Sequence, residues 1–472
     1  MTEKFDYYNS EDFKEILRQY EESVKSGAPI YMDADDLTDI ADYYNSHDRI
    51  SEAENAMSLA IEYNPEALGP MLYMARQALK KKDYDTAEQY IEKVQVLDAI
   101  EALYLRAEIL IEKGNIDEAD KLFTQFAEEE VPSDEYDDFI KSVADLYLDY
   151  NHFAKASEWI ARDTDVDSEE FKELMARTLF GLGDYKDSED MFNELLDQNP
   201  YSSDYWNGLA DVQYMKKDYS SALSSSEYAI AINPNNTNSL LAKAITLHAM
   251  GNITEAIKHL KKYVKKEPNN ELGFLHLGSC YVKSGALKEG LEAFKKGVSV
   301  ASVDSPILPD LYQEMAFANS HLGNLEDALW CMDMTDKLDC DHAQMHITKG
   351  HILLLNKKKE EAQAIFDKEL KESGNDPKLK LRVIISYQDN NYNELAYNGY
   401  LDYFKSLGND NKDGYSYMAL CCYDLGKRDE FLYYLKKACD CNPEEARTIF
   451  APLFPEDMEP KDYYEDALNN PD

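Results

Sequence analysis

Positive charge is scarce in this sequence. The 472 residues include 49 lysines and arginines against 92 aspartates and glutamates, which gives a formal net charge of −43. A surface with this excess of negative charge repels phosphate backbones and anionic lipid headgroups, so we expect neither a nucleic acid nor a membrane as partner. The excess is uneven, because residues 1–200 have a net charge of −31 and residues 201–450 a net charge of −6.

Long apolar runs are also missing. No stretch reaches the ~18 apolar residues that a transmembrane helix needs. The first residues, MTEKFDYYNSEDFKEIL, lack a basic segment followed by an apolar one, so no secretory signal is predicted. The seven cysteines are an odd number and none precedes Cys280, which favours a reducing compartment over a disulfide framework. We therefore expect a cytoplasmic protein.

The common catalytic and metal-binding motifs are absent. There is no G-x-S-x-G, no glycine-rich phosphate loop and no H-E-x-x-H. Cysteines crowd the region around Cys421 and Cys441, but their spacing does not match common zinc sites, so buried thiols are favoured over a metal site. The histidines between His248 and His351 are spaced too irregularly to form one ligand set. We predict no enzymatic activity and no cofactor.

What the sequence does contain is a repeat of helix pairs. In residues 203–236, two amphipathic helices flank a polar break at residues 216–218, and Pro234 ends the second helix. Pro200, Pro234 and Pro268 are spaced 34 residues apart. A small residue recurs once per unit where two helices must cross closely. In the second helix of each pair this column holds Ala53, Ala87, Ala119, Ala156, Ser188, Ala222, Ala256, Gly290, Ala328 and Ala362.

This pattern resembles the tetratricopeptide repeat family. The matching residues in one unit are Trp206, Leu209, Ala210, Asp218, Tyr219, Ala222, Ala229 and Pro234, and those in another are Phe274, Leu277, Gly278, Tyr281, Gly285 and Phe294. The resemblance covers about residues 34–445. It implies an all-α fold, a superhelical α-solenoid of about 12 helix-turn-helix repeats.

The predicted organisation has four parts. Residues 1–33 hold an N-terminal capping helix, because the exposed apolar face of a terminal repeat needs a cover. Repeats 1–8 occupy residues 34–304, and repeats 9–12 occupy residues 305–445. Residues 446–472 hold a C-terminal capping helix and an acidic tail.

The resemblance also implies a concave groove lined by the first helix of each repeat. The groove positions hold Asp35, Asp42, Tyr104, Glu108, Asp145, Arg177, Asn207, Asp211, Tyr214 and His248, and the same stripe includes Ile111 and Leu148. The groove begins acidic and becomes more apolar toward the middle of the chain. The clamp of basic residues with which some family members bind chaperone tails is not matched. We therefore expect a protein or peptide partner with basic residues next to apolar or aromatic ones.

Two functions follow from this reading. The first is a non-enzymatic protein–protein interaction scaffold that binds a partner peptide or helix in the groove. The alternative is an acidic chaperone-like assembly factor that shields basic or aggregation-prone clients. A basic stretch at residues 258–266 has two interpretations, a solvated outer face or a docking patch for the acidic N-terminal half of another copy. Self-association is therefore included among the expected partners.

Overall fold

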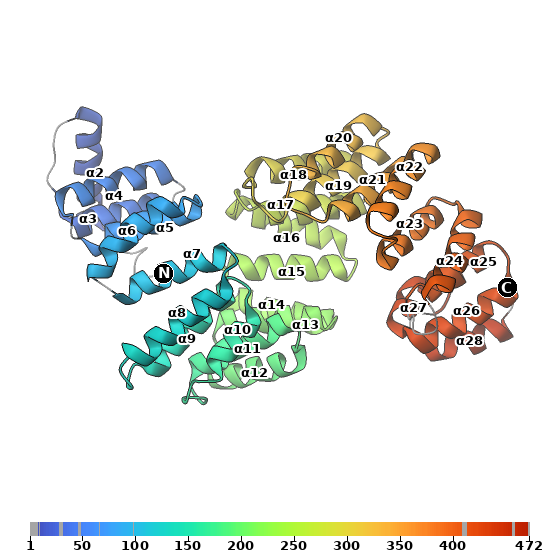
Figure 1. Cartoon of the computed structure of the whole chain (residues 1–472), viewed down its shortest axis with the longest axis horizontal. Coiled ribbons are helices and arrows are strands. Elements are labelled where there is room, and N and C mark those ends of the chain that lie inside the picture. Colours follow the sequence, from blue (N-terminus) through green and yellow to red (C-terminus); the bar gives the residue numbers. More distant parts are fainter. Residues whose placement is uncertain are drawn as a thin grey trace. The chain divides into compact units, whose positions relative to one another are not determined.

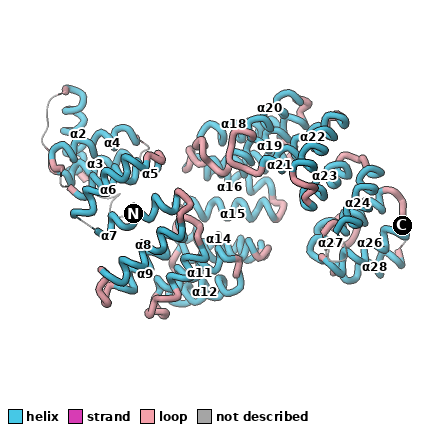
Figure 2. The backbone as a smooth tube through the Cα atoms, in the orientation of Figure 1, coloured by secondary structure: helices cyan, strands magenta, loops and turns pink. Residues whose placement is uncertain are grey.

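A computed structural model describes residues 8, 10–27, 32–45, 49–65, 67–97, 99–407, 413–455 and 458–470. Over these residues the regular structure is entirely helical, as Figure 2 shows. This confirms the predicted all-α class. Parts of the predicted terminal segments, residues 1–7, 9, 28–31, 456–457 and 471–472, lie outside the described residues.

The helices form pairs in chain order (Figure 1). The first helices of the pairs are α3 (Ala34–Asn45), α5 (Leu68–Lys80), α7 (Ala99–Glu112), α9 (Tyr136–Asp149), α11 (Glu169–Leu182), α13 (Ser203–Met215), α15 (Thr237–Ala249), α17 (Glu271–Lys283), α19 (Leu308–His321), α21 (His342–Leu355), α23 (Pro377–Asp389) and α25 (Tyr415–Asp424).

The second helices follow after short turns. They are α4 (Ile50–Tyr63), α6 (Tyr84–Leu97), α8 (Ile116–Glu129), α10 (Phe153–Ile160), α12 (Tyr185–Gln198), α14 (Tyr219–Ile232), α16 (Ile253–Lys266), α18 (Leu287–Val300), α20 (Leu325–Thr335), α22 (Lys359–Glu372), α24 (Asn393–Leu407) and α26 (Arg428–Cys441). The twelve pairs in the described part of the chain confirm the predicted repeat count.

Each pair closes around a small residue facing a bulky one. The predicted alanines of the second helices, such as Ala222 and Ala256, are completely buried. The first helices also need a small residue at the crossing: in α17 a Cβ atom at Gly278 would lie 2.3 Å from the ring of Phe294, which is itself fully buried. Close helix crossing of this kind repeats the same core contact in successive pairs.

The turn between the two helices of a pair needs one residue with a positive φ angle. Glycine supplies it in several pairs, for example Gly285 with φ 83°. In other pairs the position is held by lysine or asparagine: Lys82, Asn151, Lys217, Lys357 and Asn391. The left-handed conformation costs a residue with a Cβ atom roughly 1–2 kcal/mol, so these turns are maintained by the packing on either side.

Additional helices cover the array near its two ends. At the N-terminal end, α2 (Glu11–Ser26) places Phe13 and Tyr20 in one apolar cluster with Leu37 and Tyr44. At the C-terminal end, α27 (Pro443–Phe450) contacts α25, and α28 (Pro460–Asn469) contacts α26. None of the helices in the described ranges combines the length and hydrophobicity needed to span a bilayer.

The chain divides into two compact units, Met1–Met191 (unit 1) and Phe192–Asp472 (unit 2). Within each unit the first helices of successive pairs contact one another, for example α5 with α7 and α15 with α17. These helices therefore line one surface, which we call the A face of each unit. The predicted division of the repeats at residues 304 and 305 stays a prediction.

Candidate functional site

The A face of unit 1 is centred on Glu108 of α7. The hydroxyl group of Tyr150, just after α9, lies 3.5 Å from Glu108 Oε2 and 3.4 Å from Glu112 Oε1, so its one hydrogen is shared between the two carboxylates. Burial raises the pKa of the Glu108 carboxyl group to about 7, against the opposing effect of Arg76 and with a further rise from Glu112. Near neutral pH both the protonated and the ionised form of the Glu108 carboxyl group are therefore populated.

The neighbouring groove residues of unit 1 are arranged differently. Asp35 is exposed on α3, and Asp42 is half-buried one helix turn from Asn45, which accepts a 3.0 Å hydrogen bond from Tyr73. Tyr104 packs into the core, with its ring centroid 5.8 Å from that of Phe123. Of Asp35, Asp42 and Tyr104, only Tyr104 lies on the same helix as Glu108, and none of the three carries a positive charge.

Arg177 of α11 is occupied by carboxylates of α9. Its guanidinium group donates to Asp145 at 2.7 Å and lies 3.7 Å from Asp149. Two of the predicted groove residues, Arg177 and Asp145, are thus brought together as an ion pair. The pair is half-exposed, so it contributes little to stability and is open to exchange with a partner's charge.

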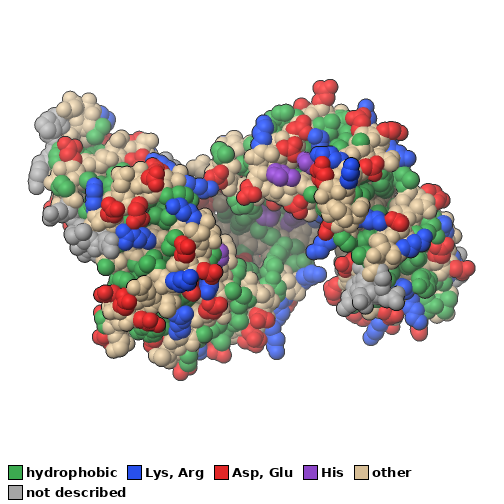
Figure 3. Space-filling view, in the orientation of Figure 1, with side chains coloured by type: hydrophobic (Ala, Val, Ile, Leu, Met, Phe, Trp, Pro, Cys, Tyr) green, Lys and Arg blue, Asp and Glu red, His purple; other side chains and the backbone are tan. Residues whose placement is uncertain are grey.

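The A face of unit 2 is more apolar. In Figure 3 hydrophobic side chains and histidines gather in the hollowed surface around α15. On α13, Asn207 donates a 3.3 Å hydrogen bond to Asp211, and burial raises the pKa of Asp211 to about 6. Tyr214 packs against Tyr219, with ring centroids 5.5 Å apart.

Two histidines lie together on the same face. Burial lowers the pKa of His276 on α17 to about 4, and the nearby His248 lowers it further. The pKa of His248 is also lowered, by burial and by Lys283. His248 Nε2 and Asn207 Oδ1 are buried atoms without a hydrogen-bond partner among the described residues. Both histidines are therefore mainly neutral at pH 7, and the two unpaired polar atoms lie beneath the surface of the face.

Sequence spacing missed several of these residues and misplaced two others. Glu112, Tyr150 and Asp149 were not among the predicted groove residues. Ile111 and Leu148, predicted to line the groove, are instead 4% and 6% exposed within the apolar core, so that part of the prediction is wrong. Glu112 could have been found from the sequence, because it lies four residues after Glu108 and so on the same side of the helix.

The cysteines and histidines form no metal site within the ranges that the structure describes. Cys421 and Cys422 are completely buried, and burial raises the pKa of both thiols to about 12. They are therefore protonated at physiological pH, as expected of thiols that serve only packing.

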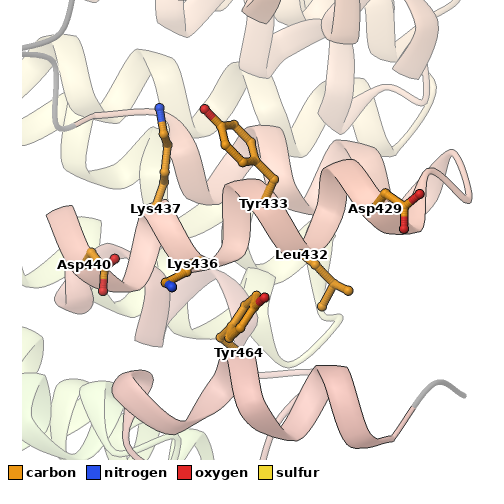
Figure 4. A pocket seen from close by; sticks show the side chains of 7 residues that line it. All are labelled: Asp429, Leu432, Tyr433, Lys436, Lys437, Asp440 and Tyr464. Carbon is orange, nitrogen blue, oxygen red and sulfur yellow. The ribbon is translucent and has the colours of Figure 1, made fainter.

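A cavity of about 390 Å³ lies beside α26 and α28, lined by Asp429, Leu432, Tyr433, Lys436, Lys437, Asp440 and Tyr464. In Figure 4 Lys437 and Tyr433 project to one side of α26, and Tyr464 comes from the facing helix on the other. The ammonium groups lie over aromatic rings, Lys436 at 5.3 Å from Tyr464 and Lys437 at 5.0 Å from Tyr433. The side chains that line the cavity thus come from both sides of α26, and their functional groups do not point toward one common position.

Comparisons with known proteins identify the repeat. Models of the tetratricopeptide repeat match residues 101–130, 174–237 and 213–274. The chain is a tetratricopeptide repeat protein. The matched ranges include pairs of both units, and the twelve pairs extend the same organisation over the rest of the described array.

Two relatives of this tetratricopeptide repeat protein are similar to it over only part of their own length. The Hsp70-Hsp90 organizing protein of Triticum aestivum is 22% identical over 66% of this chain and 50% of its own length. Anaphase-promoting complex subunit 7 of Mus musculus is 23% identical over 45% of this chain and 38% of its own. The chain thus spans half or less of the length of these relatives.

Among solved structures, a tetratricopeptide repeat protein from Parabacteroides merdae is similar over 53% of this chain and 96% of its own. The identity is 13% and the TM-score 0.42, so nothing further is drawn from it.

Proposed function

We propose that this tetratricopeptide repeat protein is a non-enzymatic protein-interaction scaffold. On this proposal the A face of unit 1 binds a partner segment that carries a basic residue next to apolar or aromatic ones. The observation that carries the proposal is the Glu108 carboxyl group, partly buried beside Glu112 and without an ion-pair partner among the described residues. A desolvated carboxylate that forms no ion pair is complementary to a lysine or arginine side chain.

The surroundings of Glu108 support this partner chemistry. The Tyr150 ring offers an apolar surface beside the carboxylates, and the Arg177 pair with Asp145 and Asp149 adds a second acidic group on the next helices. Unit 1 as a whole has 19 basic and 48 acidic residues, a net charge of −29. Two relatives, an organizing protein for Hsp70 and Hsp90 and a subunit of the anaphase-promoting complex, support a role in bringing proteins together.

The test begins with a random peptide display selected on the full-length chain. We expect enrichment of lysine or arginine beside apolar residues. Selected peptides should bind the E108Q/E112Q variant at least about tenfold more weakly, the equivalent of 1.4 kcal/mol. The matched control is E92Q/E118Q, which removes two exposed carboxylates of α6 and α8 and should leave the affinity unchanged.

Proton release gives a second readout that a general charge effect does not produce. At pH 7 about half of the Glu108 carboxyl groups carry a proton, because the pKa of this group is about 7. A bound cation favours the ionised form, so titration calorimetry in two buffers should detect release of up to about half a proton at pH 7 and almost none at pH 9. Equal binding by E108Q/E112Q, or no proton release, contradicts the proposal.

The acidic chaperone-like assembly factor is the alternative, and the charge of unit 1 favours it. Such a factor would bind many basic clients with an affinity that falls steeply with salt concentration. A scaffold with a defined site would instead bind one class of peptide with one-to-one stoichiometry. The same calorimetric titrations, repeated at increasing salt with histone-like and neutral test proteins, separate the two.

A further inference from the structure

One helix of unit 2 has the opposite charge to the rest of the protein. The α16 helix holds five lysines and one glutamate, a net charge of +4, and no other helix that the structure describes is as basic. All five lysines are exposed, while Ala256, Leu260 and Tyr263 on the other side of the helix are buried. We call the surface formed by Lys258, Lys261, Lys262, Lys265 and Lys266 the basic face.

Neighbouring groups hold three of these lysines in place. Lys258 lies 3.0 Å from Glu255, and Lys266 donates to the carbonyl oxygen of Pro234 and to Asn235, both at 3.1 Å. The Lys261 ammonium group lies 5.4 Å from the ring centre of Tyr281. Lysines that are already ordered lose less conformational entropy when a partner binds.

The other two lysines are available to a partner. Lys262 and Lys265 form no ion pair with any residue that the structure describes, and both are exposed. They lie one helical turn apart. The chain has 92 acidic residues that could have supplied a counter-ion, yet no described one pairs with either lysine. The basic face is about 12 Å long, at 1.5 Å per residue, and carries one glutamate contact against five lysines.

The sequence contains a segment with the complementary charge. Residues 128–138 run from the last turn of α8 into the first turn of α9, and they hold seven carboxylates and no basic residue. Six of the seven carboxylates are exposed, whereas Asp137 accepts a 2.6 Å hydrogen bond from Thr164. We call residues 128–138 the acidic segment.

We propose that the basic face docks the acidic segment of a second copy of this chain. This contact is separate from the Glu108 site, and it requires no change in either surface, since both are formed by exposed side chains. Each copy carries one of each surface, so the contact is heterologous and extends into open head-to-tail chains unless its rotation closes a ring.

The net negative charge of both copies does not prevent this contact. At the physiological ionic strength of 0.15 M the Debye length is about 8 Å, so charges distant from the contact are largely screened. Opposite charges in direct contact are screened much less. A nucleic acid or a lipid surface would instead bring many more negative charges against the rest of the chain.

Sedimentation velocity of the full-length chain tests the proposal over a concentration series. We expect the sedimentation coefficient to increase with concentration at physiological salt and to stop increasing at high salt. The variant K262E/K265E should weaken the association about tenfold. The matched control K371E/K378E makes the same change in net charge at exposed lysines of α22 and the start of α23, and it should associate like the wild type.

A charge swap identifies the pairing. The variant E128K/E130K should also lose self-association when studied alone. An equal mixture of E128K/E130K with K262E/K265E should associate again, because each reversed surface then meets an opposite charge on the other variant.

The results that overturn the proposal are distinct. A wild-type sedimentation coefficient that does not change with concentration rules out docking between copies and leaves the basic face to another acidic protein. Undiminished association of K262E/K265E, or a mixture that stays monomeric, shows that the copies meet through other surfaces.

Discussion

The Glu108 site predicts an unusual dependence of stability on pH. The pKa of the Glu108 carboxyl group is about 7 in the folded chain, against 4.5 for an ordinary glutamate, because burial penalises the charged form. The folded state therefore binds this proton more tightly than the unfolded state. Its stabilising contribution is complete below pH 4.5 and is lost as the pH rises through about 7.

The size of the effect follows from the shift. At 1.36 kcal/mol per pKa unit, the ionised carboxylate destabilises the folded state by roughly 3 kcal/mol at pH 8. The E108Q variant cannot ionise, and its amide can still accept the hydrogen bond from Tyr150. The unfolding free energy of E108Q minus that of the wild type should thus grow from about zero at pH 4 to roughly 2–3 kcal/mol at pH 8.

Tryptophan fluorescence can report on unit 1 by itself. Trp159 is fully buried in the cluster that also contains Phe123 and Ala107, next to Glu108 in α7. In a W206F/W330F background, urea unfolding followed at Trp159 measures the stability around the site, which matters because repeat arrays need not unfold as one unit.

The control for this experiment is E118Q, which removes an exposed carboxylate of α8 that is surrounded by solvent. Its stability difference from the wild type should stay flat from pH 4 to pH 8. If the E108Q difference is equally flat, the Glu108 carboxyl group is not desolvated and the reasoning is refuted.

Two further predictions concern unit 2. The D211N variant should be more stable than the wild type at pH 8 by roughly 3 kcal/mol and equal to it at pH 3, because burial raises the pKa of Asp211 to about 6. Urea unfolding followed at Trp206 measures this difference, and a difference that does not change with pH would argue against the prediction. The G278A variant should lose about 1–3 kcal/mol of stability, because the new methyl group would overlap the buried Phe294 ring. Thermal unfolding by circular dichroism tests it, with S284A on the exposed end of α17 as control, and an unchanged midpoint would show that the ring can move aside.

Much of the fold could be predicted because its determinants are local and repeat. A small residue such as Ala222 recurs in the second helix of each pair, and its recurrence with a period near 34 residues marks the buried helix crossing of each unit. The turns were harder to predict. Lys82 and Lys217 adopt the left-handed conformation that sequence rules reserve for glycine, and only the packing of the flanking helices requires it.

The site could be predicted only in part, because exposure depends on the neighbouring helix as well as on spacing. Glu108 and Asp145 meet Tyr150 and Arg177, and their part in binding a partner stays a prediction. Ile111 and Leu148 occupy the next position of the same stripe but are covered by the core of unit 1. Tyr150 reaches Glu108 from 42 residues away, a contact that periodicity within one helix does not contain.

The turns held by lysine or asparagine have a consequence for how the array opens. Glycine would adopt the positive φ angle at Lys217 or Lys357 without the roughly 1–2 kcal/mol that a side chain costs there. In a repeat array stability is close to a sum of local terms, so each such turn weakens its own pair more than distant ones. Hydrogen exchange should then be fastest in pairs such as α13–α14 and α21–α22. The residue at each turn would thus determine which helix pairs unfold first. A substitution at one turn would change the stability of its own pair without changing the residues of a binding surface.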